Sequence, residues 1–421
     1  MADARDPDQP CSETGASGLR RVRLFEVLMV FTRLGLTSFG GPIAHIGYFH
    51  EALVRRRRWV SEARFAALIA LSNLLPGPSS SQVVQALGAA RAGGNLGALA
   101  AFVAFTWPSA LIMLALALGV ERVGALTDQP WVMALKAAAL GVVIHAAITM
   151  ARASVRGRLE LVIVLASSGA ALMPGGMGYA AGIVLVAAAL GFLRGAGPDA
   201  APQPEPAADP APGPAVARGS RRAAAFCLGL FLSLLVMLPL GARLTGDPTL
   251  QMLDAFYRAG ALVIGGGHVL LPLLEGEVVA RGFIDRDTFL AGYGAAQALP
   301  GPLFAFAAYV GALSQVGPGG VLGGLLALGA VFLPGALLMS AAAPFLDHAM
   351  AAPRLARAVR AGSAAAVGLV IAVIVGTLMP ALGGSVGAWL IAGATLAGLM
   401  SGRVPVLVLL ALAVGAGLVA L

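Results

Sequence analysis

The stretch Phe31–Gln82, FTRLGLTSFGGPIAHIGYFHEALVRRRRWVSEARFAALIALSNLLPGPSSSQ, decides the fold because the chain contains it twice. The second copy begins at Phe256 and reads FYRAGALVIGGGHVLLPLLEGEVVARGFIDRDTFLAGYGAAQALPGPLFA. After small insertions or deletions, the match continues into the apolar runs that follow, from Pro108 in one copy and from Pro334 in the other. Self-similarity of this kind predicts two structural repeats.

Each copy contains one apolar run that is broken by glycines and another that is broken by Pro-Gly-Pro. The breaks are Gly40-Gly41-Pro42 and Pro76-Gly77-Pro78 in the first copy, and Gly265-Gly266-Gly267 and Pro300-Gly301-Pro302 in the second. Broken apolar segments at corresponding positions of two halves are typical of the binding sites of secondary transporters.

The composition places the chain in a membrane. Of the 421 residues, 58% are hydrophobic and 11% are charged, whereas a soluble domain carries roughly 25% charged residues. Apolar runs such as Leu99–Val120 and Ala223–Leu240 suit helices that cross a hydrocarbon core of about 30 Å. Without the alternating pattern of a barrel, the sequence predicts an all-α integral membrane protein.

The order of the segments along the chain gives the domains. Gly195–Ser220 is rich in proline and alanine and has too little apolar content to pack, so we expect it to be flexible. We predict a disordered cytosolic tail (1–20), a first repeat (21–194), a flexible linker (195–222), an extra transmembrane helix (223–249) and a second repeat (250–421).

The arginines predict the topology, because cytoplasmic loops collect Lys and Arg. The net charge is +8. All the arginine clusters can lie on the cytoplasmic side if the runs 24–54 and 62–91 are re-entrant hairpins, which enter and leave the membrane on the same side. Complete spans are then expected near 95–120, 130–151, 159–173, 177–194, 223–240, 318–346, 355–378, 384–400 and 404–421. This topology inverts the repeats, with the N-terminus in the cytoplasm and the C-terminus outside. A rival topology lets the broken segments cross fully.

The breaks supply groups that suit an anion. A helix that starts inside the membrane presents unpaired N–H groups and the positive end of its dipole, and several such ends at mid-depth would form an anion cradle. The candidate residues are Gly40, Gly41, Pro42, Pro76, Gly77, Pro78, Ser79, Ser80, Ser81, Gln82, Gly265, Gly266, Gly267, Pro300, Gly301 and Pro302. The alternative is that these glycines and prolines only kink and pack helices.

Charged and titratable residues inside the apolar runs are further candidates. Arg33 and Arg258 occupy matching positions and suit an oxyanion, although Asp254 has helical ion-pair spacing to Arg258. His45 and His268 are candidate proton carriers or neutral donors, unless neighbouring carbonyls satisfy them. Glu51 and Glu275 match each other and are candidates for proton coupling, or else are solvated carboxylates.

The sequence lacks the signatures of the common enzyme classes. It has no Walker A loop, and its Gly383–Gly387 match to GxSxG has no surrounding strand and turn. No spacing indicates a metal site or a cofactor, and the positive charge indicates membrane orientation and not nucleic-acid binding. We assign no role to Lys136 or His145, which are expected on opposite faces of one helix.

The motifs SFGGPIAHIGYFHE, RRWVSEARF and LLPGPSSSQ, together with VIGGGHVLLPLLEGEVV and ALPGP, resemble the chromate ion transporter family in its long, two-domain form. The resemblance implies export of chromate from the cytosol by alternating access, and hence chromate resistance, with sulfate as the natural look-alike. Asn73 stands where the family pattern has glutamine, which the second repeat keeps as Gln297, and both join the candidate site. His268 replaces an aromatic residue, so substrate preference stays open.

The physics agrees with export, because an inside-negative potential drives a dianion outward by about 4.6 kcal/mol per 100 mV. We therefore expect a transporter in the cell's inner membrane that binds chromate, or sulfate, between the broken hairpins. The alternatives are a transporter of sulfate or another oxyanion, and a membrane enzyme that acts on a lipid or phosphate ester. The sequence allows a homo-oligomer.

Overall fold

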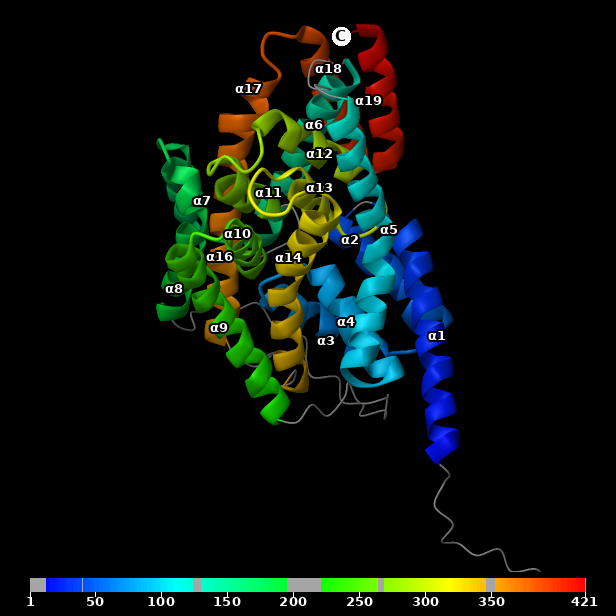
Figure 1. Ribbon diagram of the computed structural model, residues 1–421. Coiled ribbons are helices and arrows are strands. Elements are labelled where there is room, and N and C mark those ends of the chain that lie inside the picture. The colour runs from blue at the N-terminus through cyan, green and yellow to red at the C-terminus, as the bar shows by residue number, and fades with distance from the viewer. Residues whose placement is uncertain are drawn as a thin grey trace, which may run out of the picture.

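The structure is a computed structural model that describes residues 13–39, 41–123, 130–194, 221–263, 269–345 and 353–420. All regular elements in these ranges are helices (Figure 1). The first repeat contains α1 (Glu13–Thr37), α2 (Gly41–Phe49) with the π-helical turn η1 (His50–Arg56), α3 (Glu62–Leu74), α4 (Ser79–Ala92), α5 (Gly94–Val123), α6 (Pro130–Ser154), α7 (Arg158–Leu172), the 3-10 turn η2 (Gly176–Tyr179) and α8 (Ala180–Leu193).

The second repeat follows the same order. After α9 (Arg221–Thr245) come α10 (Pro248–Leu262), α11 (Leu270–Leu274) with the π-helical turn η4 (Glu275–Val279), α12 (Arg286–Gln297), the 3-10 turn η5 (Leu303–Ala305) with α13 (Phe306–Leu313), α14 (Gly320–Ala342) with the 3-10 turn η6 (Ala343–Phe345), α16 (Pro353–Val373) with the π-helical turn η7 (Ile374–Leu378), α17 (Met379–Ala381), α18 (Val386–Ser401) and α19 (Val406–Ala420).

Local sequence explains why matching helices begin and end at matching residues. The Ser61 side chain caps α3 by accepting from the Arg64 N–H, and Asp285 caps α12 in the same way by accepting from Thr288. Both helices end at a Pro-Gly-Pro turn, because the residue before a proline is pushed out of the helical region. The two repeats therefore share their caps as well as their turns.

The broken segments are too short to cross a membrane. α2 has 9 residues and continues into the 7 residues of η1, and α3 has 13 residues. These segments are at most about 24 and 20 Å long, against a core of about 30 Å. In Figure 1, α3 and α4 lie in the same half of the molecule as the N-terminal end of α1, whereas α12 and α13 lie in the half that contains the C-terminus. The structure thus has the re-entrant form of the fold, with hairpins that enter from opposite sides.

Five described helices are long and apolar enough to span a membrane: α5, α6, α9, α14 and the continuous helix of α16, η7 and α17. Helices stand where complete spans were expected at 159–173, 177–194, 384–400 and 404–421. With 15, 14, 16 and 15 residues, however, α7, α8, α18 and α19 are shorter than the roughly 20 residues of a complete crossing. These helices form two further half-length hairpins. The two repeats still have opposite orientations in the membrane, because α5, α6 and α9 make an odd number of crossings between the hairpins of the first repeat and those of the second.

The half-length hairpins are exchanged between the repeats. α7 and α8 of the first repeat pack on α16 of the second, and α18 and α19 pack on α6 of the first. Glycines allow this close approach: a Cβ on Gly141 of α6 would lie 2.6 Å from the Ala392 carbonyl oxygen, and one on Gly368 of α16 would lie 2.5 Å from that of Val164. Small residues at such contacts are typical of helix packing in membranes.

Two segment boundaries differ from the expectation. α1 begins at Glu13, inside the stretch that was expected to be a disordered tail. The expected linker lies outside the described residues, except for Arg221 and Arg222, which begin α9. α9 itself is the extra helix, and it packs on α10 and α14.

Candidate functional site

The broken segments of the two repeats meet reciprocally. The Gly301 N–H, in the second Pro-Gly-Pro turn, donates to the carbonyl of Ser38 at the end of α1, over 2.9 Å. The Gly77 N–H, in the first turn, donates over 2.7 Å to the carbonyl of Val263 at the end of α10. Val263 is the repeat counterpart of Ser38, as Gly301 is of Gly77. Such an exchange of equivalent contacts indicates an approximate two-fold relation between the repeats.

Both turns require glycine. Gly77 has φ +120° and Gly301 has φ +94°, a region that other L-residues rarely adopt. A Cβ on Gly77 would lie 2.7 Å from the Cα of Gly335 in α14, and one on Gly301 would lie 2.8 Å from Ser109 Oγ in α5. Each turn is therefore pressed against a helix of the opposite repeat, close to that helix's internal proline, Pro334 or Pro108.

The donors that follow the first turn are mostly engaged or buried. The Gln82 amide nitrogen donates to the carbonyls of Pro76 and Gly335, over 2.8 and 3.2 Å. Ser80 and Ser81 are buried and Ser79 is half-buried, all at the start of α4. Pro78 and Pro302 cap their helices and do not form the first helical residue. The Gly77 and Gly301 amides already have partners, so in this conformation they do not face an anion.

A cavity of about 110 Å³ lies beside the second turn, between α2, α6, α12, α18 and α19. Its lining includes the backbone of Gly41 and Gly301 and the side chains of His145 and Gln297. His145 Nδ1 and Gln297 Nε2 are buried without a hydrogen-bond partner among the described residues. The cavity is thus lined by the start of α2, by the second Pro-Gly-Pro turn and by two side chains with unused hydrogen-bonding capacity.

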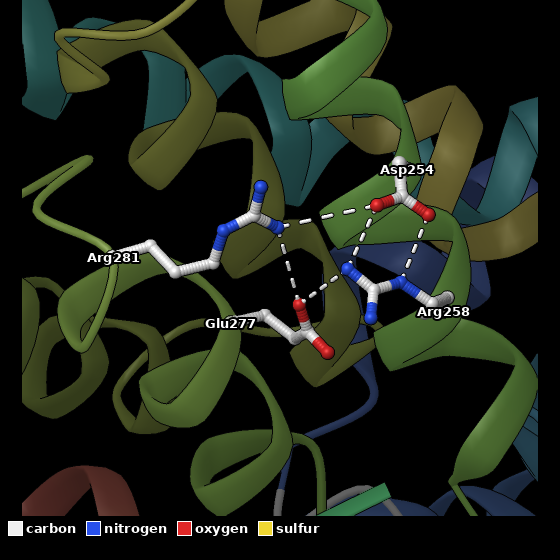
Figure 2. Close-up of polar contacts among 4 residues, drawn as sticks. All are labelled: Asp254, Arg258, Glu277 and Arg281. Atoms are coloured by element: carbon white, nitrogen blue, oxygen red, sulfur yellow. Dashed lines mark hydrogen bonds and ion pairs between the residues drawn. The ribbon is translucent and has the colours of Figure 1, made fainter. Parts of the chain in front are cut away.

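The two matching arginines have different surroundings. Arg33 is exposed on α1, without an ion pair among the residues that the structure describes. Arg258 pairs with Asp254 at 2.7 Å, as the local-pairing alternative had it, and also with Glu277 at 2.9 Å. Figure 2 shows how these three side chains and Arg281 form one network across α10 and η4.

The network belongs to the second repeat alone. Asp254 and Glu277 are almost fully buried, and both also lie within ion-pair distance of Arg281, at 4.0 and 3.4 Å. Their counterparts in the first repeat are Met29 and Leu53, which carry no charge. Two carboxylates therefore neutralise two guanidinium groups in the second repeat, whereas the matching positions of the first repeat have neither carboxylate.

The two matching glutamates differ in the same way. Glu51 is exposed, and the Arg56 guanidinium that bonds it over 2.8 Å holds the pKa of Glu51 below its usual value. Glu275 is buried, accepts a hydrogen bond from Thr377 of η7 over 2.6 Å and lies 3.4 Å from Arg286. Its second oxygen has no hydrogen-bond partner among the described residues. Of this pair, only Glu275 is a buried carboxylate with spare capacity to take up a proton.

His45 is buried in α2 between the rings of Phe49 and Phe105, with centroids 6.1 and 5.5 Å away. The His45 ring lies close to the Ser38 backbone, but neither of its ring nitrogens makes a hydrogen bond of normal geometry among the described residues. Asn73 is exposed near the end of α3. Pro42 lies in the first turn of α2. Gly40, Gly265, Gly266, Gly267 and His268 lie outside the described residues.

The structure places Gly41, Gln297 and the second Pro-Gly-Pro turn around one cavity and Gln82 beside the first turn, while Arg33, Asn73 and Glu51 are exposed. Sequence reasoning missed His145, Thr377 and Glu277. Lys136, which shares α6 with His145, instead pairs with Asp287 at 2.7 Å. The signal for His145 was its position inside an apolar run, but nothing in the sequence showed that α12 and α19 would pack beside it.

Fold and site together define a multi-pass membrane protein made of two inverted repeats whose broken helices meet at the centre. The family model described as "Chromate transporter" matches residues 25–193 and 250–418. The chain therefore belongs to the chromate transporter family.

Relatives of known name agree with this assignment. The chain is 28% identical to the "Chromate transport protein" of Cupriavidus metallidurans over 87% of its own length and 86% of the relative's. It is 27% identical to the protein of the same name from Pseudomonas aeruginosa, over 72% of this chain and 69% of the relative. A "Probable chromate transport protein" of Synechococcus elongatus is 28% identical over 84% of each chain. No solved structure matches the fold significantly.

Proposed function

We propose that this protein is a secondary transporter that exports chromate from the cytosol by alternating access, and so confers chromate resistance. The observation that carries the proposal is the reciprocal pair of contacts, Gly301 to Ser38 and Gly77 to Val263. Each contact joins a turn of one repeat to the hairpin of the other repeat, which enters from the opposite side. If only one of the two contacts were broken at a time, the centre of the protein would be open to one side of the membrane at a time. The relatives named as chromate transport proteins support chromate as the substrate.

The distribution of arginines supports the orientation. Arg21 lies in the N-terminal half of α1, and Arg91 lies in the last turn of α4, which is in the same half of the molecule as the N-terminal end of α1 (Figure 1). Under the rule that basic residues collect in the cytoplasm, this side is cytosolic in the plasma membrane, and the C-terminus is outside. The membrane potential then drives a dianion outward.

Vesicles of known orientation test both substrate and direction. In inside-out vesicles from cells that express the chain, an inside-positive potential should drive chromate uptake, because their lumen corresponds to the outside of the cell. Right-side-out vesicles loaded with chromate should release it when their inside is made negative. Excess sulfate in the same assay reports whether the two oxyanions compete. Chromate fluxes equal to those of vesicles without the protein would contradict the proposal, and sulfate flux alone would favour the sulfate alternative.

We further propose that Glu275, and not Glu51, couples transport to protons. Glu51 stays ionised because Arg56 lowers its pKa, so Glu51→Gln should leave the pH dependence of transport unchanged. Glu275→Gln should flatten that dependence, because the buried carboxylate has an oxygen with no hydrogen-bond partner among the described residues. Transport rates measured from pH 5 to 8 in matched vesicles check this, and identical profiles for both variants would refute it.

A further inference from the structure

The two repeats share a backbone plan but differ in the chemistry of the buried positions where they cross. In the first repeat, Ser38 follows α1, Ser81 lies in the first turn of α4, and Thr106 lies in α5 just before Pro108. In the second repeat, the repeat match places Val263, Ala305 and Phe332 at these three positions. At these three positions the first repeat is therefore polar and the second repeat is apolar.

The polar positions hold side chains with unused hydrogen-bonding capacity. Ser38, Ser81 and Thr106 are at most 2% exposed, and their hydroxyl oxygens have no partner among the described residues. His45 is 1% exposed, and its ring lies close to the Ser38 backbone, although neither ring nitrogen makes a hydrogen bond of normal geometry among the described residues. A buried polar group without a partner costs about 1–3 kcal/mol, so several of them in one small region point to a ligand that satisfies them.

These side chains belong to one packed region. α4 packs on α5, α1 and α2, and the His45 ring lies edge-on to Phe105, the neighbour of Thr106. The Gly301 turn binds the Ser38 carbonyl over 2.9 Å. The same turn approaches Ser109 of α5, whose hydroxyl donates to the Thr106 carbonyl over 3.1 Å. Ser38 and Thr106 thus lie near the place where the second turn meets the first repeat, and Ser81 lies on α4, which packs on the same helices.

The matching region of the second repeat is filled instead. Phe332 is 2% exposed and packs against Phe304 and Phe102, with ring centroids 5.6 and 4.9 Å away. Val263 and Ala305 are also buried. Aromatic and aliphatic side chains offer an oxyanion no hydrogen bond, so these three side chains can support the fold but cannot hold the substrate.

We propose that the protein has a single oxyanion site, formed on the first-repeat side of the crossing by the hydroxyls of Ser38, Ser81 and Thr106 and the imidazole of His45. The proposal rests on the transport function proposed above and names the groups that contact the substrate. The ligand class is a tetrahedral, doubly charged oxyanion, whose four oxygens accept hydrogen bonds in several directions.

The site holds its anion with neutral donors. Arg33 is exposed, and two carboxylates occupy Arg258, so neither matching arginine supplies a countercharge. Hydroxyl and neutral imidazole groups stabilise a dianion through dipoles and bind it less tightly than a fixed cation would. A transporter benefits from this, because the substrate has to leave as readily as it enters.

The test uses the purified full-length protein, with chromate and sulfate as probes. Calorimetric titration in detergent should give one oxyanion per chain. Thr106→Val and Ser38→Ala should each weaken binding about tenfold, the effect of losing one hydrogen bond to a charged group, and should raise the transport KM in proteoliposomes by a similar factor. Thr106→Ser, which keeps the hydroxyl, should restore both quantities.

Matched controls come from hydroxyls that already have partners. Thr395 donates to the Ile391 carbonyl and Ser72 to that of Ile69, each over 2.8 Å, and both are buried, so Thr395→Val and Ser72→Ala should leave binding unchanged. Two oxyanions per chain, or unchanged binding and KM in Thr106→Val and Ser38→Ala, would overturn the single site while leaving the transport function in place. A wild-type protein that neither binds nor transports an oxyanion would overturn the transport function and the site together.

Discussion

Replacing Gly77 with alanine is expected to abolish transport and to lower the thermal stability of the protein by more than any other single change at the two turns. The new Cβ would lie 2.7 Å from the Gly335 Cα, which is backbone and cannot rotate away. The φ of +120° adds strain of about 1–2 kcal/mol for a non-glycine residue. Thermal unfolding in detergent and transport in vesicles measure the two effects.

The equivalent change in the second turn should be milder and reversible. Gly301→Ala places its Cβ 2.8 Å from the Ser109 Oγ, which is a side-chain atom, and Ser109→Gly removes that atom. The double variant Gly301→Ala/Ser109→Gly should therefore recover part of the stability and transport that Gly301→Ala loses. Equal damage in Gly77→Ala and Gly301→Ala, with no recovery in the double variant, would contradict the packing described here.

Replacing Asp254 with alanine is expected to destabilise the second repeat by about 3 kcal/mol, the lower end of the range for breaking a buried ion pair. The lower end applies because the Arg258 side chain is 30% exposed. The variant leaves two guanidinium groups with Glu277 as the carboxylate they share (Figure 2). The expected result is a lower unfolding temperature with unchanged membrane insertion.

Two further variants separate charge imbalance from general damage. Asp254→Ala/Arg258→Ala removes a whole pair and leaves Glu277 with Arg281, so it should be more stable than Asp254→Ala. Glu51→Ala breaks an exposed pair of the first repeat and should change the unfolding temperature little, since surface ion pairs contribute little. A single Asp254→Ala variant as stable as the wild type would show that the network does not hold the hairpin.

The sequence predicted the positions of the broken helices and the two repeats, because local sequence signals determine them. The Pro-Gly-Pro turns, the glycine breaks and the repeat itself are visible in the chain, and they fix where α3, α4, α12 and η5 begin and end. Arginine placement predicted the re-entrant hairpins. The all-α class and the paired repeats follow from composition and self-similarity, and family membership followed from the motifs within them.

The sequence could not predict which side chains meet, because that depends on packing between distant segments. The half-length hairpins looked like spans since their apolar runs give no sign of where a bilayer ends. Arg33 and Arg258 looked equivalent by position, yet η4 brings Glu277 to Arg258 while Arg33 stays exposed. His145 gained its place beside Gln297 only when α6 packed against α12.

The exchange of hairpins has a consequence for how the molecule is made. When α7 and α8 emerge during synthesis, the surface that they will cover on α16 has not yet been translated, and α6 stays without α18 and α19 until the chain is nearly complete. Neither half can therefore mature alone, and a polypeptide carrying one repeat would need a second, oppositely inserted copy to supply the missing hairpin.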